Sequence, residues 1–352
     1  MNVLSIREYP DAQTFYSVHS HKDYFYVCGI ASNGGVTGSN SGIVLRDYIP
    51  TLANPNPNPT TYITTQPWEY HKIKAINNGN DIAVSGTDGN EIGFTAFDIA
   101  GRNFVPVQTV GQNESWKFST SQPLQVNSKV PITNDPNNSQ GLILSAMTYA
   151  STGHEIEMYM FNNYQTLSNG YTVSNLLFSN PNVYVLEDAN TSINISPGER
   201  IAWVGNITPV GAIGAHLNYP FFISIDMAFQ QQPTHVHFVP NSINPLCYFS
   251  LHKVHSWNGD FHCGGFYNYS NNNKTTFTVK PAQAIGDGCA IENTTTLKFN
   301  PNTLPTQIDP LPITGITISV NSHSWHQKQY NFCMTDCDDT PLNNSANNNC
   351  GN

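Results

Sequence analysis

Short apolar segments that end in a small residue recur along the chain at an almost constant spacing. Six of them can be aligned, and their last residues are separated by 57, 60, 59, 59 and 56 positions. They span residues 24–29, 82–86, 142–146, 201–205, 261–264 and 316–320. Repeats that cover nearly the whole chain at this period predict a series of similar supersecondary units rather than unrelated domains.

A second apolar segment follows each of the first segments after a polar loop. These second segments span 42–46, 92–97, 156–161, 221–225, 275–279 and 330–334. Several alternate apolar and polar residues, which is typical of a half-buried strand. With further segments at 68–73, 183–186 and 234–238, each unit holds about four short strands, as the blade of a β-propeller does.

This pattern of a strand ending in glycine, followed by a second strand, resembles the general class of repeat β-propellers. It covers most of the chain, but no WD series, kelch Gly-Gly pair or Asp-box repeat identifies a specific family. A β-solenoid is the competing architecture, although its repeats are usually much shorter. We therefore expect one all-β propeller of six blades over residues 1–339, followed by a polar tail at 340–352. Residues 2–7 should form a strand that completes the sixth blade and closes the ring.

Two columns of the repeat carry expectations about packing, because side chains on a strand alternate between its faces. Two positions before the end of each first segment stand Val27, Val84, Leu144, Trp203, His262 and Ile318. Immediately before the end stand Cys28, Ser85, Ser145, Val204, Cys263 and Ser319. The first column should pack between blades, and the small residues of the second should suit the crowded axis of the ring.

Trp203 and His262 interrupt the aliphatic column in neighbouring units, which has two interpretations. Either they fill an irregular space in the core, or the symmetry is broken there to form a ligand pocket. Other His and Trp residues gather nearby in the sequence, which supports the second interpretation. The candidate ligand-binding residues are thus Trp203, His255, Trp257, His262, His323, Trp325 and His326.

Metal and cofactor signals are weak. Pairs such as His19 and His21 suit zinc, copper or nickel, but no Cys or carboxylate stands at a fixed spacing from them. Calcium is a weak candidate at Asp336, Asp338 and Asp339, although acidic turns are commoner. No cofactor is otherwise expected.

The seven cysteines leave at least one unpaired. Cys28 and Cys263 should be buried thiols, since both fall on apolar strands. Cys337 and Cys350 are the best candidates for a disulfide, which would hold the tail against the last blade.

Composition narrows the classes of partner. Only 11% of the residues are charged, and 14 Lys and Arg against a net charge of −10 argue against nucleic acid. No apolar run approaches the roughly 18 residues of a membrane span, and the N-terminus lacks a recognisable secretory signal. The nine Asn-x-Ser/Thr sequons are uninformative, since 44 Asn give about seven by chance. An extracellular or virion-surface location remains the expectation.

Catalytic signatures are largely missing from the sequence. Four scattered arginines do not match a sialidase triad, and the acidic residues occur mostly singly rather than as the pair a glycosidase needs. The preferred function is a non-catalytic binding or assembly module that recognises another protein or a glycan. The alternative is a polysaccharide lyase that uses a His/Tyr site on the propeller face, which rests on analogy between folds alone.

Overall fold

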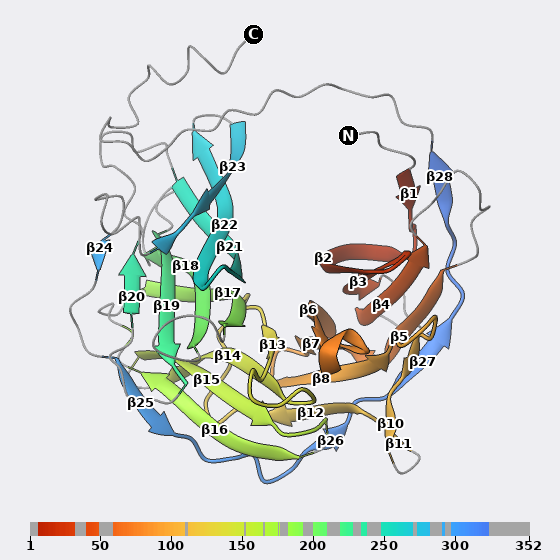
Figure 1. The fold of residues 1–352 in the computed structure, drawn as a ribbon, viewed down its shortest axis with the longest axis horizontal. Coiled ribbons are helices and arrows are strands. Elements are labelled where there is room, and N and C mark those ends of the chain that lie inside the picture. Colours follow the sequence, from red (N-terminus) through yellow and green to blue (C-terminus); the bar gives the residue numbers. More distant parts are fainter. Residues whose placement is uncertain are drawn as a thin grey trace. The chain divides into compact units, whose positions relative to one another are not determined.

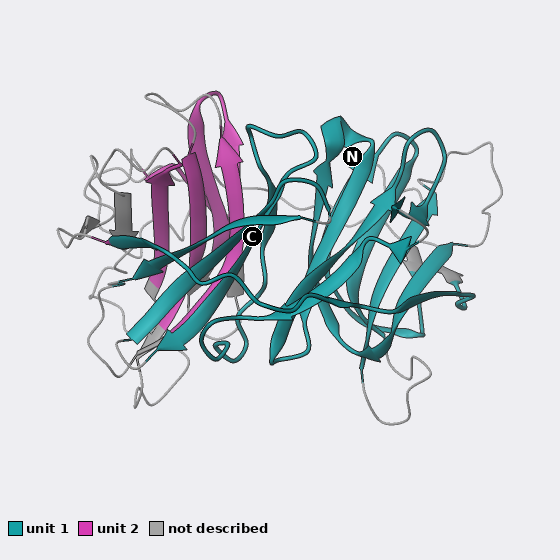
Figure 2. Cartoon of the chain, turned by 90° about the horizontal axis from the view of Figure 1, so that it is seen from below, with its two compact units in different colours: residues 1–176, 298–325 teal, residues 177–297, 326–352 magenta. Residues whose placement is uncertain are grey.

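The structure is a computed structural model, and it is built from β-strands. It describes residues 6–31, 40–48, 59–109, 112–150, 153–164, 166–174, 176, 182–192, 200–209, 219–227, 234–237, 248–269, 273–281, 291–292 and 297–323. Two compact units divide the chain (Figure 2): unit 1 holds residues 1–176 and 298–325, and unit 2 holds residues 177–297 and 326–352. Among the described residues, no helix has the length and apolar character to cross a membrane.

The three larger antiparallel sheets of unit 1 are called blades 1 to 3 (Figure 1). Blade 1 is formed by β2 (Ala12–His21), β3 (Tyr24–Ala31), β4 (Ser41–Tyr48) and β5 (Thr60–Pro67). Blade 2 is formed by β6 (Glu69–Ile76), β7 (Asp81–Thr87), β8 (Glu91–Asp98) and β12 (Ser115–Ser119). Blade 3 is formed by β13 (Ile132–Asn134), β14 (Leu142–Ala150), β15 (Gly153–Phe161) and β16 (Leu167–Ser174).

Unit 2 contains blades 4 and 5. Blade 4 is formed by β17 (Asn182–Ser192), β18 (Arg200–Pro209), β19 (Tyr219–Asp226) and β20 (Thr234–His237). Blade 5 is formed by β21 (Tyr248–Trp257), β22 (Asp260–Tyr269) and β23 (Asn273–Val279). The chain is therefore all-β with a propeller-like succession of five blades, and the expected count of six is wrong for the described residues.

The strand expected at 316–320 is wrong for most of its length. Residues 317–320 are not part of a strand, and Ile316 is the last residue of β27 (Ile313–Ile316), which pairs with β5 at the outer edge of blade 1 instead of starting a new blade. Beyond it, β28 (Asn321–His323) pairs with β1 (Ile6–Glu8), so a strand near the N-terminus does meet a late segment of the chain. The two strands form a sheet of their own among the described residues, and the expected completion of a sixth blade is wrong. The predicted strand at 330–334 and the tail lie outside the described residues.

Residues 298–323, which we call the return segment, add an outer strand to each blade of unit 1 in reverse order (Figure 1). In turn, β25 (Lys298–Pro301) pairs with β16, β26 (Asp309–Pro310) with β12, and β27 with β5. In unit 2, β24 (Ile291–Glu292) likewise pairs with β20. These short strands, of which β25 and β26 contain proline, occupy sheet edges that would otherwise expose unpaired backbone groups.

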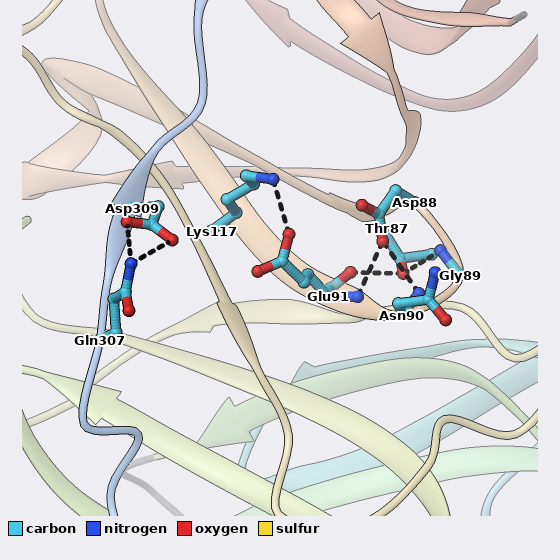
Figure 3. Close-up of polar contacts among 8 residues, drawn as sticks. All are labelled: Thr87, Asp88, Gly89, Asn90, Glu91, Lys117, Gln307 and Asp309. Atoms are coloured by element: carbon cyan, nitrogen blue, oxygen red, sulfur yellow. Dashed lines mark hydrogen bonds and ion pairs between the residues drawn. The ribbon is translucent and has the colours of Figure 1, made fainter.

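Charged side chains lie on both sides of the pairing between the return segment and blade 2 (Figure 3). Lys117 on β12 lies opposite Asp309, and its Nζ donates to Oε2 of Glu91 at 2.6 Å. The hydrogen bond to Glu91 raises the pKa of Lys117, and the carboxylates of Asp88 and Asp309 act in the same direction. Nε2 of Gln307 donates to both oxygens of Asp309, at 2.8 and 3.0 Å, and so fixes that carboxylate.

The recurring glycine of the repeat lies opposite a bulge. The strands β2, β6, β17 and β21 each shift register by one residue, at Tyr16, His71, Glu187 and His252. A Cβ at Gly29, Gly86, Gly205 or Gly265 would lie 1.8 to 2.2 Å from a carbonyl oxygen of the bulged strand. The bulge, rather than a turn, therefore requires glycine there.

This geometry corrects the alignment of the fifth repeat and the interpretation of both columns. The glycine that faces the bulge in blade 5 is Gly265, not Gly264. Val84 packs in one cluster with Cys28 of blade 1, whereas the Oγ of Ser85 donates to the carbonyl of Val130 before blade 3 at 2.5 Å. In blade 2 both columns therefore lie between blades on opposite faces, and Ser85 does not depend on a crowded axis. Val27 and Ile318 of the first column instead pack with Leu45 beside blade 1.

Candidate functional site

Trp203 and His262, which the sequence places in one column, lie in different surroundings. Trp203 on β18 is fully buried and faces Ala189 across the strand pair, so it is a core residue. With Gly265 as the reference, His262 belongs to the opposite face from the first column. The structure therefore supports the core interpretation for Trp203 and leaves His262 with the exposed residues of blade 5.

Three other predicted residues come together on the β21–β22 hairpin. Asn258 and Gly259 form its turn with positive φ angles of 48° and 80°, the conformation that an Asn-Gly hairpin turn favours. His255 and His262 are direct cross-strand partners. The ring of Trp257, 63% exposed, lies 5.9 Å from the ring of His262 between centroids. The hairpin thus holds an aromatic group in a defined, solvent-accessible position.

This group belongs to a larger surface, which we call the open face of blade 5. Alternation along the three strands and their pairing place its members on the same side of the sheet. None of these described residues is buried, and Phe266 is 41% exposed. The exposed and half-buried residues of the open face are Lys253, His255, Trp257, Asp260, His262, Gly264, Phe266, Thr276 and Thr278.

The other face of blade 5 is covered by blade 4. Val254, Phe261 and Cys263 pack in one cluster with Ala202, Val204 and Phe222. Cys263 is a buried thiol, as expected, and burial raises its pKa; Cys28 is also buried.

Polar side chains of blade 4 also bind the backbone of blade 5. Asp188 accepts a hydrogen bond from the N–H of Val254 at 3.1 Å, and Asn190 donates to its carbonyl at 3.3 Å. Asp188 and Asn190 are the first and third residues after the bulge of β17. Counted from the bulge of β21, the equivalent residues lie on the open face of blade 5. In blade 5 the same positions hold Lys253 and His255, and both are exposed.

Two ion pairs lie beside the open face. The Nδ1 of His252 lies 3.3 Å from Oε2 of Glu187, and the Nζ of Lys280 lies 2.7 Å from Oδ2 of Asp260. Each carboxylate next to the surface therefore has a cationic or imidazole partner. The open face therefore combines aromatic, imidazole and threonine side chains with the Lys253 ammonium group and with the Asp260 carboxylate, which is paired with Lys280.

A second grouping in unit 1 bears on the His/Tyr alternative. The ring of Tyr16 contacts His71 edge to face at 5.5 Å, and Lys129 lies over the Tyr16 ring at 3.8 Å. The N–H of Val130 donates to Nδ1 of His71 at 3.1 Å, so the His proton resides on Nε2, which faces Glu69 at 3.4 Å.

The electrostatics of this grouping do not suit a tyrosine base. Burial, and then the Glu69 carboxylate, raise the pKa of Tyr16. The hydrogen bond from His71 lowers the pKa of Glu69. A lyase that removes a proton with tyrosinate needs a tyrosine whose pKa is lowered, which is the opposite direction.

The remaining predicted residues are not brought to this site. His323 is part of β28 in unit 1, and Trp325 and His326 lie outside the described residues. Also outside them are the calcium candidates Asp336, Asp338 and Asp339 and the cysteines of the proposed disulfide, Cys337 and Cys350. Within the described ranges, no group of three or more His, Cys, Asp or Glu is arranged to hold a metal ion.

Phe266, Thr276 and Thr278 are members of the open face that sequence reasoning did not single out. The alternation of side chains along β22 and β23 could have predicted their position, because Val279 lies on the covered side of the sheet and its neighbour Thr278 lies on the open side. No protein-family model and no curated protein matches this chain.

Proposed function

We propose that the chain is a non-catalytic recognition and assembly module that binds another protein through the open face of blade 5. One observation carries the proposal: in blade 4, the face equivalent to the open face is covered by blade 5. In blade 5 this face is exposed, with Trp257 at 63% and Phe266 at 41% exposure.

The chemistry of the face suits a protein partner. Exposed aromatic residues on a rigid hairpin are the usual anchors of protein interfaces, and Trp contributes more binding energy than most residue types. Threonine and imidazole groups around it supply hydrogen bonds without the desolvation cost of carboxylates. On composition, we place this role outside the cell or on a particle surface.

Site-specific photo-crosslinking tests this proposal in the organism or particle that makes the protein. A benzophenone amino acid replaces Trp257 in one full-length variant and Val126 in the control. Val126 is 71% exposed in unit 1, so it is at least as accessible. We expect a discrete crosslink to another polypeptide, a second copy of this chain included, from position 257 and not from position 126.

Two results would overturn the proposal. A crosslink within the same molecule would mean that the chain itself covers the face, and equal labelling from both positions would mean that contact is unspecific. Release of unsaturated product from an anionic polysaccharide would instead support the lyase, whose His/Tyr site lies in unit 1 if Tyr16 and His71 form it.

A further inference from the structure

A cavity of about 950 Å³ lies in unit 1, away from the residues discussed for function. It falls in the range of roughly 300–1,000 Å³ that small-molecule sites occupy. Its walls come from β5, the turn η1 (Asn77–Gly79), the start of β7, the end of β8, β9 (Val105–Pro106), β10 (Gln108–Thr109), Gln140 before β14, and the turn after β15. Side chains from three successive blades therefore converge on one space.

Asp81 is the most constrained polar group of the cavity. It is 6% exposed, yet its carboxylate borders the space. Tyr164 donates to its Oδ2 at 2.5 Å and Asn77 donates to the same atom at 2.8 Å. Both hydrogen bonds that the structure gives Asp81 thus use Oδ2, and Oδ1 remains as an acceptor for a ligand hydroxyl.

Asp98 lies directly opposite Asp81 across the β7–β8 pair. Its Oδ1 accepts from the N–H of Ala100 at 2.7 Å and its Oδ2 from Nδ2 of Asn103 at 3.1 Å. Like charges across a strand pair are unfavourable, so these donors, with Asn77 and Tyr164, hold both carboxylates in place. Such an arrangement is costly for stability and is explained by a ligand that uses it.

The rest of the lining determines which ligand fits. Tyr62 and Tyr164 supply aromatic rings, and Val105, Pro106 and Val107 supply an apolar wall. Amides come from Gln108 and Gln140. Among the lining residues there are two carboxylates and no Lys, Arg or His, so phosphate, sulfate and uronate groups would meet uncompensated negative charge.

We propose that this cavity binds a neutral saccharide, with hydroxyl groups of a sugar ring donating to Asp81 and Asp98. Carboxylate and amide groups match the paired donors and acceptors of vicinal hydroxyls. The tyrosine rings and the Val105–Val107 wall contact the apolar C–H face of the ring. This proposal is independent of the protein-binding role of blade 5.

The experiment screens the full-length chain on an array of neutral, uronate-containing and sulfated glycans, followed by calorimetry on any ligand found. We expect neutral glycans to bind and anionic glycans to be absent from the hits. Asp81→Asn should weaken binding at least tenfold, because it removes the charged acceptor while keeping the size of the side chain.

Two further variants keep the test decisive if Asp81→Asn fails to fold. Val105 is 48% exposed on the cavity wall, so Val105→Trp fills the space without removing a buried hydrogen bond and should abolish binding. Asp309→Asn is the matched control, since it alters a hydrogen-bonded carboxylate of unit 1 outside the cavity and should leave binding unchanged.

A silent array, hits restricted to anionic glycans, or unchanged affinity in Val105→Trp would each overturn the saccharide site. The variant with the benzophenone amino acid at position 257 distinguishes this proposal from the previous one. It should bind neutral glycans as tightly as the unmodified chain, because position 257 is not among the lining residues of the cavity.

Discussion

Asn302 in the return segment donates a hydrogen bond from Nδ2 to Oε2 of Glu157 in blade 3, at 3.2 Å. Glu157 is fully buried and also accepts from the N–H and Oγ of Ser121 at 2.9 and 2.6 Å, from the N–H of Gln122 at 3.1 Å, and from Tyr159. Burial, and then Glu157 itself, raise the pKa of Tyr159, which keeps that hydroxyl protonated as a donor. One carboxylate therefore joins β15, the loop before β13 and the return segment.

Replacing this carboxylate should destabilise the protein strongly. Glu157→Gln keeps the shape but points an NH₂ group at donors, so we expect a loss of about 2–4 kcal/mol in the free energy of unfolding. Asn302→Ala removes one donor and should cost about 1 kcal/mol. Urea denaturation measures both, and a double-mutant cycle should show coupling between the two sites. A Glu157→Gln variant as stable as the unmodified protein would contradict this role.

The glycine opposite each bulge gives a second prediction. A Cβ at Gly86 would lie 1.9 Å from the carbonyl oxygen of Glu69, which forces the backbone of two strands apart. Gly86→Ala should therefore lower stability by at least about 2 kcal/mol. Gly315→Ala is the control, since its nearest neighbour would be 3.6 Å away, and it should change stability by less than about 0.5 kcal/mol. Similar thermal unfolding of both variants would rule out the bulge as the reason for glycine.

That glycine explains why the strands could be predicted from the sequence. In blades 1, 2 and 4, a carbonyl oxygen of the neighbouring strand leaves no room for a Cβ at Gly29, Gly86 and Gly205. Glycine therefore recurs at the same position of these repeats and can be recognised in the sequence. Alternation on the adjoining strands then predicts their faces. In the fifth repeat two glycines stand together, and only the register with Ser250 and Leu251 identifies Gly265 as the one opposite the bulge.

The blade count and the cavity depend on pairing between distant residues. Residues Ile313–Ile316 form a strand although their sequence, Ile-Thr-Gly-Ile, does not alternate between apolar and polar residues. Their partner β5 lies about 250 residues earlier, and no local feature of the sequence predicts this pairing. Asp81 and Asp98 look like ordinary turn residues beside Asn and Gly. They become a site only because the turns of blades 2 and 3 meet there.

Asn206 tests the polar contacts between blades 4 and 5. Its Oδ1 accepts from the N–H of Leu251 at 3.0 Å and its Nδ2 donates to the carbonyl of Leu251 at 3.1 Å. Asn206→Asp replaces the donor with an oxygen facing that carbonyl, so we expect a loss of about 2–3 kcal/mol. Asn300→Asp, on the exposed part of β25, should be nearly neutral. Equal stabilities by urea denaturation would contradict the bridging role, which also explains why the Asn206 sequon is part of the core.

The last prediction concerns acid. His154 is 8% exposed, and its Nε2 lies 2.8 Å from Oε1 of Gln125. Burial lowers its pKa, and burial also lowers the pKa of His19, aided by His21 and Lys74. Histidine in the unfolded chain has a pKa of about 6.5, so below this pH the unfolded chain binds more protons than the folded chain. The free energy of unfolding therefore falls as the pH decreases from about 6.5 towards the lower pKa of the folded state.

His154→Gln should make the free energy of unfolding less dependent on pH between about 7.5 and 5.5, because one of these groups no longer titrates. His255→Gln, at an exposed position in unit 2, is the control and should leave the slope unchanged. Glu69 affects stability in a different pH range. The hydrogen bond from His71 lowers the pKa of Glu69, so its stabilising contribution is lost only as the pH falls below 4.5, the ordinary pKa of glutamate. Denaturation midpoints at a series of pH values separate the two effects, and an unchanged slope in His154→Gln would show that protonation of this side chain does not oppose folding.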